Sequence, residues 1–191
     1  MRRRPHIGAA VLPLYLFGAF GVFGSACGAL DQFEHTITDE ATIPGMLSEG
    51  PFSPTFGMSF SGIDLSKSQS FANAGVGPGD VDAIYVKSVL VEGTHASVDR
   101  LDVLFNSITL WVEAPGVPRQ TIATKYMFDR SNQASLDVSD DGMGKAINLK
   151  PYAVAASMSV GSDVNVKTKP AFETTLRTTI VLLVDINLAG L

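Results

Sequence analysis

Hydrophobic and polar residues alternate along most of the chain, with the two-residue period of β-strands that bury one face. The clearest examples are two long runs near the C-terminus. The first places Val154, Ala156, Met158, Val160, Val164 and Val166 on one face, and the second does the same for Leu176, Thr178, Ile180, Leu182, Val184, Ile186 and Leu188. The link from Thr168 to Phe172 predicts that these two strands form an antiparallel hairpin, which we expect to be the backbone of the core.

Shorter segments upstream show strand patterns of the same kind. They are Phe33 to Ile43, Phe56 to Phe60, Val81 to Glu92, Ser107 to Ala114 and Arg119 to Met127, with short pieces at Leu136 to Val138 and Ala146 to Leu149. Val81 to Glu92 is apolar on both faces, which predicts a central strand covered on two sides. Breaks are predicted at Gly50 to Pro54 and at Pro115 to Pro118, and a short helix at Leu65 to Phe71.

This succession of strands predicts the fold class. Seven or eight strands with turn residues between them and little helix indicate an all-β protein, an antiparallel β-sandwich of the immunoglobulin-like sort. About 165 residues follow the N-terminal segment, which is the size of one domain and enough to bury a core without disulfides.

The N-terminal segment has the order of charge and hydropathy of a secretory signal. Arg2, Arg3 and Arg4 precede an apolar run of about 17 residues from Ile7 to Phe23, and small residues follow it. That length is at the lower edge of what crosses a bilayer, and no basic cluster follows the run. A cleaved signal is therefore favoured over an anchor helix, and both place the rest of the chain outside the cytoplasm.

Cys27 is the single cysteine, and its position directly after Gly24, Ser25 and Ala26 resembles the lipobox of bacterial lipoproteins. The resemblance implies that Cys27 is lipidated and begins the mature chain. Ordinary signal peptidase is the alternative, because Gly24 and Ala26 also fit its small-x-small rule. Gly28 is not the Asp that the resemblance associates with inner-membrane retention, which favours the outer membrane. The predicted organisation is a signal peptide at 1–26, the lipidated cysteine and a linker at 27–32, and the β-sandwich domain at 33–191.

Charge restricts the partners of the mature chain. Loss of the leader removes three arginines and no acidic residue, which changes the formal net charge from -5 to -8. Like charge repels nucleic acids and anionic lipid surfaces, so we expect no nucleic acid partner. Membrane attachment is expected through the lipid on Cys27, and an envelope protein or polymer is the expected binding partner.

Over its mature length the chain looks similar to single-domain predicted lipoproteins of Gram-negative bacteria. The pieces that carry the resemblance are Glu113 to Gly116 and Leu149 to Tyr152. The family has no assigned activity, so the resemblance implies an exported lipoprotein and no particular site residues. Both pieces also have a structural interpretation, as a strand that ends in a Pro-Gly turn and as a connection stopped by proline.

Residues suited to catalysis are sparse. His6 leaves with the leader, while His35 and His95 stand far apart without a cysteine partner, so neither a zinc site nor a triad is predicted. We expect His35 to be half-buried on its strand and His95 to be solvated in a turn. No serine stands in a Gly-x-Ser-x-Gly elbow, and the run Gly75 to Gly79 lacks the spacing of a phosphate loop. No catalytic residue and no cofactor are predicted.

One acidic cluster resembles the start of a calcium-binding loop. Asp137, Ser139 and Asp141 occupy its first, third and fifth places, and a glycine is sixth. Asn148 stands where an EF-hand loop has its bidentate Glu, and Lys145 adds a positive charge. An ordinary polar turn accounts for the same residues, so we expect no tight calcium binding.

These observations favour a non-enzymatic lipoprotein of the cell envelope, a binding or structural module tethered to the outer membrane at its periplasmic or surface face. One alternative is an envelope enzyme, such as a hydrolase, whose carboxylates converge only in the fold. Another is a carrier of an apolar ligand, which would show a large apolar cavity between its sheets instead of a packed core.

Overall fold

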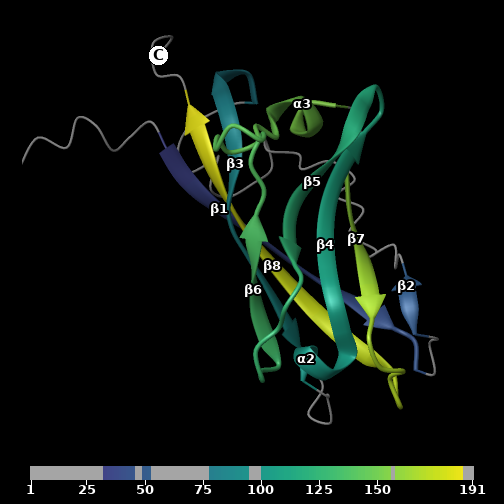
Figure 1. The fold of residues 1–191 in the computed structure, drawn as a ribbon. Coiled ribbons are helices and arrows are strands. Elements are labelled where there is room, and N and C mark those ends of the chain that lie inside the picture. The colour runs from purple at the N-terminus through teal and green to yellow at the C-terminus, as the bar shows by residue number, and fades with distance from the viewer. Residues whose placement is uncertain (1–31, 46–48, 53–77, 95–99, 156–157, 187–191) are drawn as a thin grey trace, which may run out of the picture.

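The computed structural model describes residues 32–45, 49–52, 78–94, 100–155 and 158–186. Within them the chain forms eight strands and three short helical turns (Figure 1). The strands are β1 (Gln32–Ile43), β2 (Gly50–Phe52), β3 (Val81–Gly93), β4 (Phe105–Ala114), β5 (Val117–Lys125), β6 (Gln133–Val138), β7 (Ser159–Val166) and β8 (Thr174–Ile186), and the turns are η2 (Pro78–Asp80), α2 (Leu101–Leu104) and α3 (Lys150–Ala153). None of the described helices is long and apolar enough to span a bilayer.

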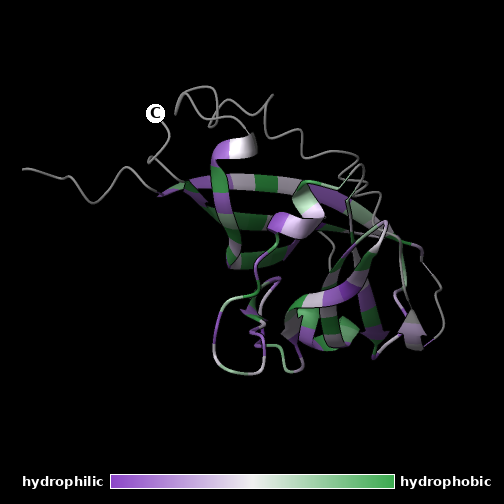
Figure 2. Cartoon of the chain, turned by 90° about the horizontal axis from the view of Figure 1, so that it is seen from above, coloured by the Kyte–Doolittle hydropathy of each residue, from purple (hydrophilic) through white to green (hydrophobic). Residues whose placement is uncertain are grey.

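The strands form one sheet that curls until its two halves face each other (Figures 1 and 2). Their order is β1-β8-β3-β6-β5-β4-β7-β2, and every pair is antiparallel. β6 joins the halves, because Gln133 to Leu136 pair with β3 whereas Asp137 and Val138 pair with β5. The predicted all-β antiparallel class is confirmed, and the arrangement is consistent with a β-sandwich.

The predicted hairpin between the last two strands is wrong, because β7 and β8 lie in opposite halves of the sheet. β7 pairs with β4 and β2, whereas β8 pairs with β1 and β3. Residues 167–173 therefore cross from one half to the other. Alternation along a strand reports which of its faces is buried, but it does not identify the neighbouring strand.

The core lies between the two halves and is made of inward-facing side chains. Figure 2 shows the alternation of hydrophobic and hydrophilic residues along the strands. On β8, Leu176, Ile180 and Val184 are at most 2% exposed, as the alternation predicts. The strand before it is shorter than predicted. Pro151, which cannot donate a backbone hydrogen bond, lies in the first turn of α3, and Val154 at the end of α3 is 59% exposed instead of facing the core.

β3 is central, as predicted, but only one of its faces is buried. Its ladder with β8 is irregular between Val81 and Ala83 and again between Val86 and Ser88. Each irregularity inserts one residue and shifts the alternation. As a result, apolar side chains at odd-numbered and at even-numbered positions both turn toward the core. Lys87 and Ser88 are exposed on the other face. The two bulges thus explain why apolar residues occupy both sets of alternating positions in this segment, although only one face of β3 is buried.

The other strand predictions are largely confirmed. β4 buries Ile108, Leu110 and Val112 completely, and the turn before β5 places Gly116 at a φ of +78°, where glycine is favoured. Gly50–Phe52, predicted as part of a break, instead pairs with β7 as a short edge strand. The leader, Cys27, His95, and the strand and helix predicted at 56–60 and 65–71 lie outside the described residues.

Candidate functional site

The connection between β6 and α3 passes between β3 and β5 (Figure 1). At its start, the Ser139 N–H donates to the Ile122 carbonyl of β5 over 2.9 Å. At its end, the Leu149 N–H donates to the Ile84 carbonyl of β3 over 2.7 Å. The connection therefore ties the two halves of the sheet together at this place.

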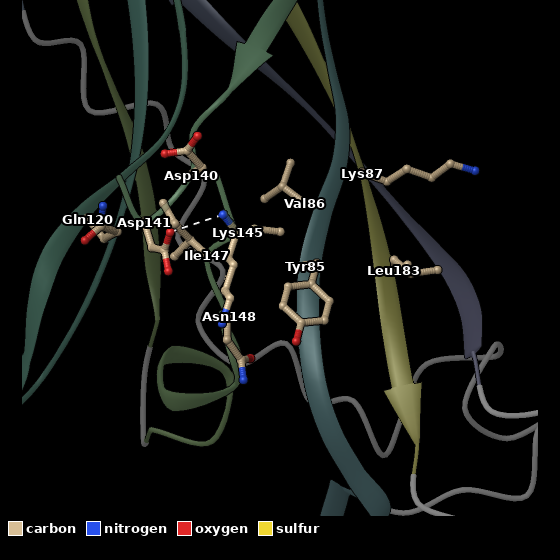
Figure 3. A pocket seen from close by; sticks show the side chains of 11 residues that line it. Tyr85, Val86, Lys87, Gln120, Asp140, Asp141, Lys145, Ile147, Asn148 and Leu183 are labelled. Atoms are coloured by element: carbon tan, nitrogen blue, oxygen red, sulfur yellow. Dashed lines mark hydrogen bonds between the residues drawn. The ribbon is translucent and has the colours of Figure 1, made fainter. Parts of the chain in front are cut away.

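A cleft of about 890 Å³ opens beside this connection (Figure 3). It is lined by Tyr85 and Lys87 of β3, Leu183 of β8 and Gln120 of β5, together with Asp140, Asp141, Lys145, Ile147 and Asn148 of the connection. The volume falls within the range of roughly 300 to 1,000 Å³ that is typical of ligand sites. This cleft is the candidate site.

One wall of the cleft is apolar. Tyr85 and Leu183 are paired residues on neighbouring strands, both partly exposed on the outward face of the sheet. Among the described residues, nothing pairs with the Tyr85 hydroxyl or with the Lys145 ammonium. An aromatic ring with a polar tip beside a leucine suits a partner that has both apolar and hydrogen-bonding groups.

The two carboxylates of the cleft are held by their own turn. Asp140 Oδ1 accepts the Gly142 N–H over 2.7 Å, and Asp141 Oδ1 accepts the N–H groups of Met143 and Lys145 over 2.8 and 3.1 Å. Figure 3 draws the bond from Lys145. Side-chain oxygens that accept nearby backbone N–H groups are a common way to stabilise a polar turn.

The calcium candidates have other contacts in the structure. The Asp137 side chain is 79% exposed and its carboxylate lies 3.6 Å from Lys125 Nζ, and Asp141 is engaged in the turn. In the described ranges, no group of three or more His, Cys, Asp or Glu side chains is placed to hold a metal ion. Ser139 contributes its backbone N–H to β5. The expectation of no tight calcium binding stays a prediction.

His35 is half-buried on β1, as predicted, and burial lowers the pKa of its imidazole. We expect the protein to lose stability as pH falls from about 7.5 to about 6. The unfolded chain, with a histidine pKa near 6.5, binds more protons there than the folded chain, so the free energy of unfolding decreases as the pH falls. Urea melts of His35→Gln should show a weaker pH dependence in this window. Equal slopes for both proteins would contradict the assignment.

A cluster on the outward face of β4, β5 and β7 escaped the sequence analysis. Trp111 lies against Gly161, and the Arg119 guanidinium lies over the ring, with Cζ 3.8 Å from the ring centroid. Arg119 is itself ion-paired with Asp163. This Trp111 clasp therefore joins three strands. No local pattern predicts it, since the three strands are neighbours only in the fold.

The space between the two halves of the sheet is filled by side chains. In the described residues, the core holds a void of about 10 Å³, lined by apolar residues that include Ile122, Met158 and Leu182. This is about the space of a single water molecule. It is far too small for an apolar ligand.

No protein-family model matches the chain, and no curated protein matches it. Some of the solved structures that are similar to it come from viruses. The BFDV capsid protein of a 60-mer is 11% identical, with 82% of this chain and 92% of that chain covered and a TM-score of 0.35. Mud crab dicistrovirus (12% identity, 94% and 82% covered, TM-score 0.35) and turnip yellow mosaic virus (11%, 97% and 90%, 0.31) are similar to the same degree. TM-scores this low carry no conclusion about fold or function.

Proposed function

We propose that the chain is an exported, lipid-anchored binding module of the bacterial cell envelope, without enzymatic activity, held on the outer membrane through Cys27. The order of charged, apolar and small residues that ends at the single cysteine carries this proposal. β1 begins at Gln32, so the intervening chain spans at most about 18 Å. A lipid on Cys27 would hold the domain directly against the membrane surface.

This tether would place the cleft near the membrane. Tyr85 pairs with Leu183, and Leu183 pairs with Glu34, which is two positions from the start of β1. The cleft and the first residue of β1 therefore lie toward the same end of the sheet (Figure 1). A partner in the cleft would be held at the membrane surface, as expected for an envelope protein or polymer.

The side chains of the cleft favour binding over catalysis. Asp140 and Asp141 each use one carboxylate oxygen to stabilise their turn. Tyr85 and Leu183 offer apolar contact area, and Lys145 offers a charged donor at the rim. An apolar wall with a few polar groups around it is typical of binding sites.

We also propose that the curled sheet is a β-sandwich of the immunoglobulin-like sort, occupying residues 33–191 after a signal peptide at 1–26 and a linker at 27–32. Two facing halves of antiparallel strands around one core support the sandwich. The immunoglobulin-like topology and the processing of the leader stay predictions.

Intact mass spectrometry of the protein extracted from membranes tests the anchor. We expect a mature chain that begins at Cys27 and carries acyl groups. Cys27→Ser, which keeps the size of the side chain, should lack the acyl mass and be released from the membrane fraction. A mature chain that begins at Cys27 without acyl mass, or begins beyond it, would end the lipoprotein proposal.

A photoreactive residue at Lys145 tests the cleft, with Lys169 as the control position because it is exposed in the connection before β8. Crosslinking in intact cells should give an adduct from position 145 that is lost on Tyr85→Ala. Position 169 should give none. An adduct of equal yield from both positions, or none from position 145, would remove the cleft as the binding site.

A further inference from the structure

The cleft beside the connection between β6 and α3 combines an aromatic ring with polar groups around it (Figure 3). The ring is that of Tyr85, which lies on the outward face of β3 beside Leu183 of β8. Asn148 forms a β-bridge with Tyr85, so its amide side chain belongs to the same part of the cleft wall. A ring and a leucine flanked by polar side chains suit a ligand that is apolar on its faces and polar around its rim.

The fold fixes the direction of the hydrogen-bonding groups in the cleft. Asn148 Oδ1 accepts the N–H groups of Ile84 and Lys150 over 3.1 and 2.9 Å, which leaves the side-chain N–H groups of Asn148 as donors for a ligand. Asp140 and Asp141 accept backbone N–H groups of their own turn through Oδ1. No described residue donates to their Oδ2 atoms, which remain as acceptors. Groups held in place in this way bind hydroxyls at a small cost in side-chain entropy.

The charges in the cleft favour an uncharged ligand. The lining carries two lysines, Lys87 and Lys145, and two aspartates, so the formal charges cancel. Lys87 is ion-paired with Glu34, which lies outside the lining. A polyanion would meet the two carboxylates, and a polycation would meet the ammonium of Lys145.

The backbone around the cleft disfavours an extended peptide. Addition of a strand needs unpaired N–H and C=O groups along an edge. At Ile84 of β3 both groups are used, because the N–H donates to Asn148 Oδ1 and the carbonyl accepts the Leu149 N–H. On β5, the Ile122 carbonyl accepts the Ser139 N–H. The connection therefore occupies positions at which a peptide strand would pair.

We propose that the cleft binds an uncharged glycan, with one sugar ring packed on Tyr85 and its hydroxyl groups bonded to Asn148, Asp140 and Asp141. A pyranose ring has an apolar face of C–H groups and a rim of hydroxyls that both donate and accept hydrogen bonds, which matches the groups of the cleft. The volume of about 890 Å³ has room for a short stretch of such a chain. This inference rests on the proposed function, which takes the cleft as the binding site, and it makes the partner a polysaccharide instead of a protein.

A glycan array tests the class of ligand. The full chain, purified in detergent and labelled, is applied to immobilised uncharged oligosaccharides of glucose, mannose, galactose and N-acetylglucosamine. The same array carries oligosaccharides of uronic acids and peptides of similar length. We expect binding to at least one uncharged oligosaccharide, and none to the uronic acids or the peptides. Isothermal titration calorimetry with the oligosaccharide that binds then gives the Kd of each variant.

Substitutions at Tyr85 separate packing on the ring from hydrogen bonding to its hydroxyl. Tyr85→Ala removes the ring and should weaken binding by about tenfold or more, whereas Tyr85→Phe keeps the ring and should change the Kd by less than about threefold. Tyr126→Ala is the matched control, because Tyr126 is 73% exposed and lies outside the cleft lining. It should leave the Kd unchanged. Urea melts show whether each variant is folded.

A substitution of one aspartate tests the hydrogen bonds. Asp141→Asn keeps an Oδ1 that can hold the turn, but it replaces Oδ2 by an amide nitrogen that cannot accept a hydroxyl proton. It should weaken binding about tenfold. Asp129→Asn makes the same change at an exposed residue outside the lining and should have no effect. Equal effects of the two substitutions would contradict the role of Asp141.

Other results would overturn the proposal as a whole. No binding to any uncharged oligosaccharide, or a preference for the uronic acids or the peptides, removes the uncharged glycan as the ligand. A Kd that is insensitive to Tyr85→Ala in a folded variant places the glycan outside the cleft. A protein adduct from position 145 without glycan binding keeps the cleft as a binding site and removes the glycan. Failure of the anchor is seen separately, as the absence of acyl mass on Cys27, and leaves the glycan result standing.

Discussion

Replacement of Leu182 by alanine should lower the free energy of unfolding by about 2 to 5 kcal/mol, a large share of the roughly 5 to 15 kcal/mol that holds a domain together. Leu182 is 3% exposed and lies on the core face of β8, paired with His35 on one side and Val86 on the other. Both neighbouring strands are fixed by long ladders, so the surroundings can fill the cavity only in part. Urea melts of Leu182→Ala and the unsubstituted chain measure the difference.

The opposite face of the same strand supplies the control. Arg177 is exposed, and its ion pair with Glu40 joins two side chains that are each nearly half exposed, so Arg177→Ala should change stability by only about 0.5 kcal/mol. Thr175→Ala, on the same face, should behave in the same way. A harmless Leu182→Ala together with a severe Arg177→Ala would show that the core face of β8 is wrongly assigned.

Gly161→Ala should cost about 1 to 3 kcal/mol, although it adds a single methyl group. A Cβ at this position would lie 2.2 Å from Cζ2 and 2.4 Å from Cη2 of Trp111. The indole is rigid and lies under the Arg119 guanidinium, so a movement of the ring would disturb that contact. Thermal or urea melts would show the loss.

Two further variants separate the clash from a general effect of alanine. Gly79→Ala is the matched control, because a Cβ there would meet nothing within 4 Å, and it should stay within about 0.5 kcal/mol of the unsubstituted chain. In a Trp111→Ala chain, Gly161→Ala should no longer be costly, since the atoms that it meets are gone. An equal cost in both backgrounds would show that Trp111 is not the obstacle.

Much of the candidate site could not be predicted, for a physical reason that its residues illustrate. The cleft brings together residues that are distant in sequence, namely Tyr85, Lys145 and Leu183. Tyr85 and Leu183 meet because β3 lies beside β8, and Lys145 reaches them because the connection after β6 lines the same cleft. The polar turn at Asp141 and the half-burial of His35 were predictable, since each depends on residues nearby in the chain. A site assembled from three strands leaves no local pattern.

In the fold as well, features set by nearby residues were predictable from the sequence, and features set by distant segments were not. The sequence by itself determined most of the strand segments, although not β2, and which face of β1, β4 and β8 turns inward, because a two-residue period follows from the geometry of a single strand. Only the tertiary structure decided that β7 and β8, which are consecutive, lie in opposite halves, and that two bulges give β3 one buried face. Strand partners and bulges depend on contacts between distant segments, which alternation within one segment does not encode.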